Sequence, residues 1–430
     1  MIKLLMAGDI DPQAIRDRQP ASKIGPAVEE ILGDVKKNGD EALFRYALRF
    51  DKAALTNLEV TQEEIEAAVK KTDPEFMSVL KAAAKNIEAY HQHQKSNGFI
   101  VADKPGIVMG QRVIPLDRVG IYIPGGTASY PSTVLMNAIP ARLAGVKEII
   151  MVTPTDKDGS ISPERLAAAY VCGVNRIFKV GGAQAIAALA YGTQTIPKVD
   201  KIVGPGNAYV AEAKRLVYGL VDIDMIAGPS EVLIIADDSA NPAFVAADML
   251  AQAEHDVEAA SILLTASKKI ADAVNKELKL QLTKLPRKEI AGQSLEKNGR
   301  IILVESLEKA VELSNIIAPE HLELCVEEPF ALLGIVRHAG SVFLGNYSPE
   351  ALGDYFAGPN HTLPTHGAAR FSSPLGVEAF VKKSSYLYYS KEALEKVQAQ
   401  VALFAKKEGL TAHANSATIR FENPTREEDV

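Results

Sequence analysis

The fold class is decided by residues 176–217, which read RIFKVGGAQAIAALAYGTQTIPKVDKIVGPGNAYVAEAKRLV. This stretch begins with a short apolar run, Arg176–Val180, then passes through a glycine pair into an alanine-rich segment of helical composition. The same order follows at once, because Lys201–Val203 leads through Gly204-Pro205-Gly206 into Ala208–Val217. A strand, a tight turn and a helix in succession are typical of βαβ units, whose strands pair in parallel. The stretch therefore predicts an α/β fold.

Similar strand and helix candidates continue on both sides of this stretch. Two strand candidates precede it and four follow it: Val119–Ile123, Glu148–Val152, Glu231–Ala236, Ser261–Leu264, Arg300–Val304 and Ser341–Leu344. Helical segments between them include Ser132–Leu143, Pro163–Tyr170, Pro242–Ala253 and Lys268–Leu282. With the two strands of the central stretch, the candidates are too many for one compact Rossmann sheet. We therefore expect two Rossmann-like parallel-sheet domains, with Gly228-Pro229 as the crossover between them.

The two ends of the chain follow other patterns. Residues 25–47 and 61–95 carry apolar positions at three- and four-residue spacing, which predicts a helical N-terminal region. After Phe371 the alternation stops, residues 372–390 look irregular, and Lys391–Lys407 reads as one amphipathic helix. The domain boundaries expected from these patterns are an arm at 1–24, a first α/β domain at 25–118 and 231–372, a second at 119–230, and a C-terminal tail at 373–430.

Composition excludes several classes of protein. The 430 residues are 47% hydrophobic and 23% charged, with a net charge of −7, so nucleic acid and anionic membranes are not expected partners. No apolar run approaches the length of a transmembrane helix, and the N-terminal apolar run is too short for a signal peptide. The two cysteines, Cys172 and Cys325, lie in apolar contexts that suit a reducing cytoplasm, although two thiols could still pair. We expect a cytoplasmic protein.

Three glycine-rich turns each follow a strand and precede a helix. They are Ile123-Pro124-Gly125-Gly126-Thr127, Val180-Gly181-Gly182-Ala183 and Val203-Gly204-Pro205-Gly206-Asn207. Backbone N–H groups at such a helix start can bind phosphate. None of the turns is a G-x-G-x-x-G or a P-loop, and each alone could be an ordinary tight turn. Together, at one end of neighbouring strands, they predict a ligand crevice.

Four separated segments carry candidate chemistry. Gln252 and His255 stand three residues apart on one helix face, where both could reach a metal, although a surface role would also explain them. Glu320-His321 follows a proline turn and offers a base beside a carboxylate, or a loop histidine beside a solvated glutamate. Asp354 lies in a glycine-flanked loop that could be functional or ordinary, and His413 alone would usually be structural. No compact zinc motif is present, so a metal site would have to be assembled from distant segments.

Taken together, these segments resemble histidinol dehydrogenase. The resemblance runs from about Ile24 to Phe421 and rests on four motifs in one order: 223–232 through 251–255, Pro319-Glu320-His321-Leu322-Glu323, Gly353-Asp354-Tyr355 and Leu410-Thr411-Ala412-His413. It implies a zinc- and NAD-dependent enzyme that oxidises L-histidinol to L-histidine through L-histidinaldehyde, in the last steps of histidine biosynthesis. It also implies a homodimer in which the C-terminal tails are exchanged, so that each tail completes the partner's site.

The residues that match the family motifs take the roles that the resemblance implies. Glu320 and His321 would be the acid–base pair. The zinc ligands would be Gln252, His255, Asp354 and His413. Substrate contacts would be Ser230, Gln252, His255, His321, Asp354, Glu408 and His413, and NAD contacts would be Tyr122, Gln184 and Asn207.

Two rival functions are compatible with the same residues. One is a paralogue that uses the same zinc–NAD machinery on another small alcohol, such as a sulfonated diol; Ser230 and Glu408 favour the amino alcohol. The other is a zinc-dependent hydrolase or a non-catalytic binding module on the same fold. The intact Glu320-His321 pair makes a purely binding role the weaker hypothesis.

Overall fold

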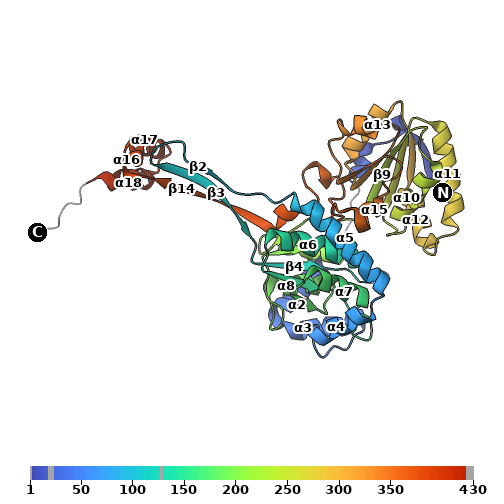
Figure 1. The fold of residues 1–430 in the computed structure, drawn as a ribbon, viewed down its shortest axis with the longest axis horizontal. Helices are drawn as coiled ribbons and strands as arrows, with labels where there is room; N and C mark the ends of the chain where they lie inside the picture. Colours follow the sequence, from blue (N-terminus) through green and yellow to red (C-terminus); the bar gives the residue numbers. More distant parts are fainter. Residues whose placement is uncertain (1, 18–23, 126–128, 423–430) are drawn as a thin grey trace, which may run out of the picture. The chain divides into compact units, whose positions relative to one another are not determined.

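The computed structural model describes residues 2–17, 24–125 and 129–422. Contacts between residues divide the chain into two compact units. The main unit comprises Met1–Lys95 and Leu116–Phe380, and the second unit comprises Ser96–Pro115 and Val381–Val430. The main unit contains two parallel β-sheets with their covering helices (Figure 1), which confirms the α/β class and the two parallel sheets expected from the sequence.

The larger sheet of the main unit has six parallel strands. Their order is β1 (Lys3–Met6), β11 (Arg300–Leu303), β10 (Ala260–Thr265), β9 (Glu231–Ala236), β12 (His321–Cys325) and β13 (Ser341–Leu344). Helices α10 (Pro242–Ala253), α11 (Lys268–Leu282) and α12 (Lys288–Asn298) join one apolar cluster, and α13 (Leu307–Ile317) joins another. Alternate residues of β9 enter the two clusters, so the strand is buried on both faces, which explains its unbroken apolar sequence.

The smaller sheet has five parallel strands in a related order. They are β6 (Arg176–Phe178), β5 (Glu148–Val152), β4 (Arg118–Tyr122), β7 (Lys201–Val203) and β8 (Asp222–Ile223). Helices α6 (Pro131–Ala144) and α7 (Pro163–Cys172) contribute to one apolar cluster, and α8 (Gly182–Tyr191) and α9 (Ala208–Val217) to another. In both sheets the first strand of the βαβ series, β4 or β9, is central, and the chain order reverses beside it. Ligands of open parallel sheets bind at such a reversal, on the carboxyl edge of the sheet.

The packing differs from the expected domain boundaries. Residues 96–115, expected in the first α/β domain, belong to the second unit, and residues 373–380, expected in the tail, belong to the main unit. Residues 25–118 were expected to join the domain of 231–372, but helices α2 (Gly25–Asn38), α3 (Asp40–Tyr46), α4 (Gln62–Lys71) and α5 (Pro74–Gln92) pack in the two clusters of the five-stranded sheet. Their apolar stripes, such as Val28, Ile31 and Val35 on α2, meet α8 and its neighbours there. Residues 1–24 were expected to form an arm, but β1 pairs with β11 at the edge of the six-stranded sheet.

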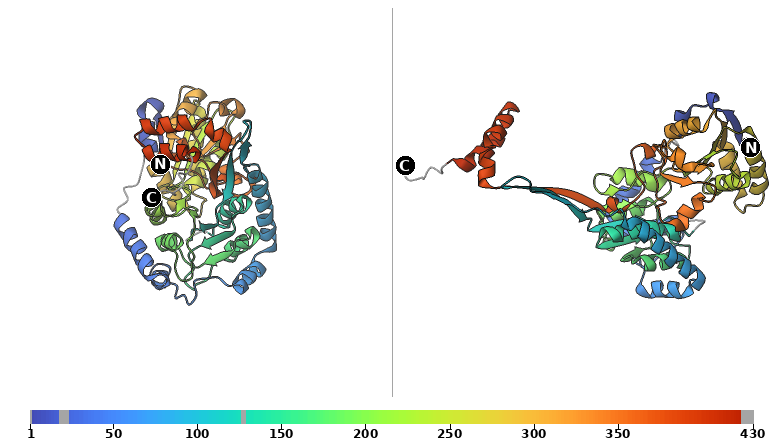
Figure 2. Two further views of the ribbon diagram at one scale, coloured as in Figure 1. Left: turned by 90° about the vertical axis from the view of Figure 1, so that its left-hand side faces the viewer. Right: turned by 45° about the horizontal axis from the view of Figure 1, so that its top comes forward.

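The second unit is an antiparallel sheet followed by helices. Strand β3 (Ile107–Pro115) pairs with β2 (Phe99–Val101) and with β14 (Val381–Tyr389) over its whole length, and Figure 2 shows β3 and β14 as a long ribbon. The expectation that 372–390 is irregular is therefore wrong for β14, which is largely exposed and so lacks apolar alternation. The helix expected at Lys391–Lys407 is interrupted, giving α16 (Lys391–Glu395) and α17 (Gln398–Lys407), and α18 (Thr411–Thr418) follows. No helix of the described residues could span a membrane.

Candidate active site

Glu320 and His321 lie at the amino edge of the six-stranded sheet. His321 is the first residue of β12, which pairs with β9, and both side chains are buried. The peptide chain at Glu231, the first residue of β9, contacts both of them. Its N–H donates to Glu320 Oε2 at 2.9 Å, and its carbonyl oxygen lies 3.1 Å from His321 Nδ1. One residue of the neighbouring strand therefore fixes the pair.

The contact with the Glu231 carbonyl determines how His321 carries its proton. A carbonyl oxygen can only accept, so Nδ1 of His321 must donate. The other ring nitrogen, Nε2, is buried, has no hydrogen-bond partner among the described residues, and lies 3.8 Å from Asp354 Oδ1. Burial opposes a charged ring, but the carboxylates of Glu350 and Glu320, together with Asp354, raise the pKa of His321 well above its usual value. Nε2 of His321 is thus the ring nitrogen that is left to exchange a proton with a substrate.

The pKa of Glu320 is higher than that of an exposed carboxyl group. Burial raises its pKa to about 7, although His321, the Glu231 N–H and the Ser230 side chain oppose the rise. A carboxyl group that titrates near neutral pH can act as a general base or acid. Glu320 and His321 are thus two neighbouring groups that can exchange protons.

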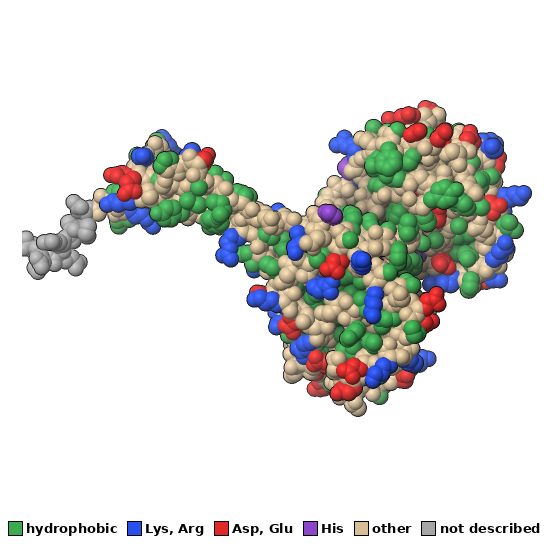
Figure 3. Space-filling view, viewed as in Figure 1, with side chains coloured by type: hydrophobic (Ala, Val, Ile, Leu, Met, Phe, Trp, Pro, Cys, Tyr) green, Lys and Arg blue, Asp and Glu red, His purple; other side chains and the backbone are tan. Residues whose placement is uncertain are grey.

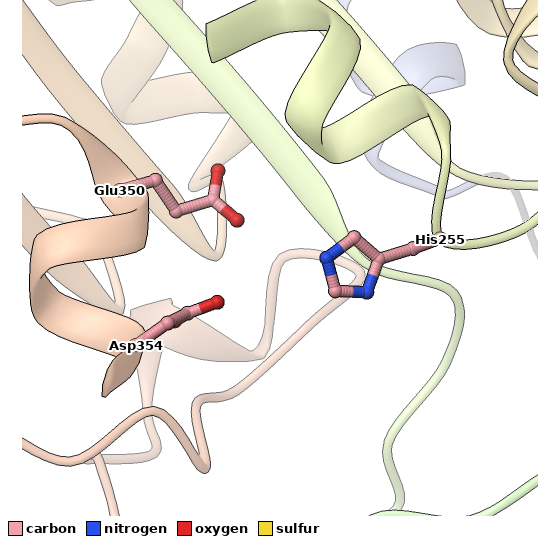
Figure 4. A group of neighbouring side chains, drawn as sticks. All are labelled: His255, Glu350 and Asp354. Carbon is pink, nitrogen blue, oxygen red and sulfur yellow. The ribbon is translucent and has the colours of Figure 1, made fainter. Parts of the chain in front are cut away.

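A possible metal site lies beside the pair. One ligand atom each of His255, Glu350 and Asp354 lies within 4.8 Å of the others, and Figure 4 shows the two carboxylates pointing toward the His255 ring. His255 follows the end of α10, Glu350 begins α15 (Glu350–Leu352), and Asp354 lies in the next helical turn, η3 (Gly353–Ala357). The loop expected around Asp354 is therefore helical. Burial raises the pKa of Glu350 to about 8. Burial would also raise the pKa of Asp354, but the neighbouring His321, His361 and His255 lower it below its usual value.

Gln252 supplies an independent test of this site. It is fully buried in the last turn of α10, and neither its Oε1 nor its Nε2 has a hydrogen-bond partner among the described residues. A buried amide without partners is costly, so such a side chain indicates a missing ligand. Three residues further on, His255 lies just beyond the end of α10. Amide oxygen, imidazole and carboxylate donors suit a divalent cation such as zinc, so the residues fit the expected metal.

The sequence did not single out Glu350. The spacing of Glu350 could have indicated a role beside Asp354, because the two are four residues apart and share one helix face when the segment is helical. The main-chain N–H of Glu350 donates to Glu323 Oε1 at 3.0 Å, so the buried Glu323 fixes the start of this segment. Glu350 is the functional candidate that sequence reasoning missed.

Glu408 and His413 belong to the second unit. Glu408 follows α17, His413 lies in α18, and both are exposed. Among the described residues, the metal-type group of His255, Glu350 and Asp354 does not include His413. In the main unit, the structure brings together Ser230, His255, Glu320, His321 and Asp354. Gln252 lies three residues before His255 on α10, and the two tail residues belong to the second unit.

The three expected cofactor residues lie at the carboxyl ends of the strands of the five-stranded sheet. Tyr122 ends β4, Gln184 is buried in the first turn of α8, and Asn207 is the N-cap of α9. The Tyr122 hydroxyl accepts a hydrogen bond from the Gly182 N–H at 3.1 Å. Tight packing also requires glycine here: a Cβ at Gly204, whose φ is +113°, would lie 2.2 Å from the Tyr122 carbonyl oxygen. In the first glycine-rich turn, residues 126–128 lie outside the described residues.

Known proteins resemble this chain along almost its whole length. A profile described as histidinol dehydrogenase matches residues 14–421. The histidinol dehydrogenase of Clostridium acetobutylicum is 56% identical over 98% of this chain and 99% of its own, and that of Listeria monocytogenes is 55% identical over 92% of each. The crystal structure of histidinol dehydrogenase from Elizabethkingia anophelis superposes with a TM-score of 0.93 at 42% identity, covering 97% of this chain and 98% of the other. The chain belongs to the histidinol dehydrogenase family.

Proposed function

We propose that this chain oxidises L-histidinol to L-histidine in two NAD-dependent steps, through L-histidinaldehyde, at the buried cluster around His321. Family membership supports the reaction. The observation that carries the site assignment is the contact of Glu231 with both Glu320 and His321, which places two proton-exchanging groups side by side. The overall reaction consumes one L-histidinol (as its ammonium form), two NAD⁺ and one water, and yields one L-histidine, two NADH and three protons.

The two side chains have separate tasks in this proposal. In the first step, Nε2 of His321 takes the hydroxyl proton as the carbinol hydrogen leaves as hydride to NAD⁺. In the second step, water must add to the aldehyde before a second hydride can leave. Glu320, with a pKa near 7, removes a proton from that water, and His321 takes the proton of the hydrate as the second hydride departs. Only the second step uses Glu320 as a base.

The metal ligands of the proposal are Gln252, His255 and Asp354 of one chain with His413 of the partner subunit. Glu350 lies beside His255 and Asp354. Bound there, zinc would supply an anchor for the imidazole and amine of the substrate and so orient the reacting carbon. The remaining substrate contacts are Ser230 and His321, together with Glu408 of the partner subunit, whose carboxylate suits the ammonium group of an amino alcohol.

The proposed NAD site is the carboxyl edge of the five-stranded sheet, within residues 119–230. Tyr122, Gln184 and Asn207 lie on turns beside the point where the strand order reverses. Helices α8 and α9 begin at this edge, and the positive ends of their dipoles suit the pyrophosphate there. Because two NAD⁺ molecules are used in succession, this crevice must release NADH while the aldehyde stays bound.

The second unit supports a homodimer with exchanged tails at residues 373–430. Its helices bury a small cluster of alanines, Ala402, Ala405 and Ala414, and expose large apolar side chains. Leu387 is 67% exposed and Phe404 is 70% exposed, and Figure 3 shows hydrophobic side chains over this unit. Such a surface on a segment with little core of its own suits burial against a second copy of the chain. The two buried free thiols, Cys172 and Cys325, suit a cytoplasmic location.

The experiment that tests the function is NADH formation from a small substrate panel. L-histidinol should give NADH, a sulfonated diol should give little, and a chelator should abolish the signal. Preference for the diol would favour the paralogue, and turnover without NAD⁺ would indicate the hydrolase. Ligand binding without any turnover would indicate a binding module.

A further inference from the structure

A tight turn at Thr365–Ala368 holds the segment that precedes β9. Between β8 and β9 the backbone runs through residues 224–230 without regular secondary structure. Within it, the Gly228 N–H donates to Thr365 Oγ1 at 2.7 Å. The His366 ring packs directly on the same glycine, because a Cβ at Gly228 would lie 1.9 Å from His366 Cε1. We call this pair of contacts the Thr365–His366 clasp.

The turn that forms the clasp is strained. The Ala368 N–H donates to the Thr365 carbonyl at 3.0 Å, and both central residues have positive φ, +51° at His366 and +73° at Gly367. These are features of a type I′ turn, in which glycine and asparagine are the favoured residues. A histidine with positive φ is uncommon, and such strain persists where neighbouring structure holds it, often at functional sites. Here the conformation places the ring against Gly228, with Nε2 3.9 Å from Glu231 Oε1.

The segment that the clasp holds leads directly to the catalytic pair. Gly228 is two residues before Ser230, whose side chain contacts Glu320. It is three residues before Glu231, whose N–H and carbonyl hold Glu320 and His321. A shift of the segment would therefore change the distance between the two groups. Displacements of about 1 Å can cost on the order of 100-fold in rate.

We propose that Thr365 and His366 are positioning residues that set the geometry of Glu320 and His321 through Gly228 and Glu231. This inference rests on the proposed roles of Glu320 and His321. Neither Thr365 nor His366 is placed at the substrate, the metal or the cofactor. Their removal should lower kcat in both half-reactions while leaving the KM for NAD⁺ and the zinc content unchanged.

The chain provides a matched control for the threonine. Thr362 is also buried in the same segment, but its hydroxyl has no hydrogen-bond partner among the described residues. Thr365→Val and Thr362→Val make the same change in shape, and only the first removes the hydrogen bond to Gly228. Thr365→Ser keeps the hydroxyl. His366→Asn removes the ring but tolerates positive φ.

The experiment compares kcat, KM and thermal midpoint of the full-length variants. We expect Thr365→Val and His366→Asn to lose about tenfold or more in kcat relative to Thr362→Val, with KM for NAD⁺ within about twofold, and Thr365→Ser to recover most of the loss. Equal kcat for Thr365→Val and Thr362→Val, or no recovery with serine, would overturn the inference. Glu320→Gln and His321→Asn are assayed alongside. If these two are fully active, the proposed function fails; if they are impaired while the clasp variants are normal, only the clasp fails.

Discussion

At the residue scale, the site depends on one buried residue of β9 that contacts two side chains. Because Glu231 donates to Glu320 and accepts from His321, neither side chain can turn without losing a buried hydrogen bond. Burial raises the pKa of Glu320 to about 7. Burial would lower the pKa of His321, but the carboxylates of Glu350, Glu320 and Asp354 raise it well above its ordinary value. Under the proposed function, His321 would serve both oxidations and Glu320 would serve the hydration of the aldehyde.

Substitutions of Glu320 and His321 should therefore slow the two oxidation steps to different extents. Glu320→Gln should slow oxidation of L-histidinaldehyde far more than oxidation of L-histidinol, because only the aldehyde step consumes water. His321→Asn should impair both, each by a factor on the order of 100 to 10,000. Single-turnover NADH formation from each substrate measures this. Equal losses in both halves for Glu320→Gln would show that its role is misassigned.

His91 shows how a single residue can mislead. Its place on a polar helix predicts a solvated side chain, but it is completely buried in α5. It continues the stripe formed by Leu80, Ala83 and Ile87, at the helical spacing that marks a buried face. The helical spacing of this stripe predicts that His91 is buried, even though histidine is a polar residue.

Burial of His91 should make the protein less stable in acid. Burial lowers its pKa below 6.5, despite the partner Gln94 and the nearby Glu378. The unfolded chain then binds the proton more readily, so stability falls as pH drops below about 6.5, by at most about 1.4 kcal/mol per pH unit. Urea midpoints between pH 7 and 5 should fall less for His91→Gln than for the unaltered chain. His93→Gln, at an exposed neighbour, should change nothing; identical slopes for all three would contradict the prediction.

At the element scale, the metal-type ligands come from the ends of short helices. The last turn of α10 carries Gln252, the next loop carries His255, and the turn from α15 into η3 carries Glu350 and Asp354. These elements meet beside the start of β12, at the amino edge of the six-stranded sheet. The core beneath them is built from apolar clusters that need no metal.

Removing the metal should therefore abolish activity without unfolding the chain. We expect bound zinc in the purified protein, and loss of zinc in Gln252→Leu, whose apolar side chain fits a buried position but offers no ligand atom. Metal analysis and circular dichroism measure the two properties independently of turnover. Loss of the whole helical signal on chelation, or full activity in metal-free protein, would contradict this.

The sequence predicts the elements whose burial is uniform. All eight strand candidates are found, and most of their apolar residues are buried, although β13 is only partly buried along its length. Strand β12 is not among the strand candidates, and its sequence HLELC places the buried Glu323 among apolar residues, where carboxylates are rare. Strand β14 was not predicted because it is largely exposed, so its sequence lacks the apolar pattern of a buried strand. The candidate site was foreseen through resemblance, as its residues are too far apart in sequence for spacing to join them.

At the scale of the whole molecule, two similarly ordered sheets divide the chemistry. The proposed NAD site uses the carboxyl edge of one sheet, and the catalytic pair uses the amino edge of the other. The second unit supplies the remaining candidates, Glu408 and His413. Under the proposed exchange of tails, an intact site needs residues from both subunits.

Mixing two inactive variants should then restore activity. His413→Ala and Gln252→Ala should each be nearly inactive, but refolding them together gives heterodimers in which one site carries both lesions and the other carries neither. Activity should return to about a quarter of normal for random pairing, since half of the dimers would each hold one intact site. If each tail served its own chain, both sites would keep one lesion. No recovery, with heterodimers confirmed by mass, would reject the exchange.

The most direct test of the account is the number of NADH molecules formed per L-histidinol. With limiting L-histidinol and excess NAD⁺, the protein should form two NADH and one L-histidine for each L-histidinol consumed, without accumulation of free aldehyde. One NADH per L-histidinol, with the aldehyde as product, would contradict the second oxidation and the role of Glu320 in it. No NADH at all would contradict the central claim that this site oxidises the amino alcohol.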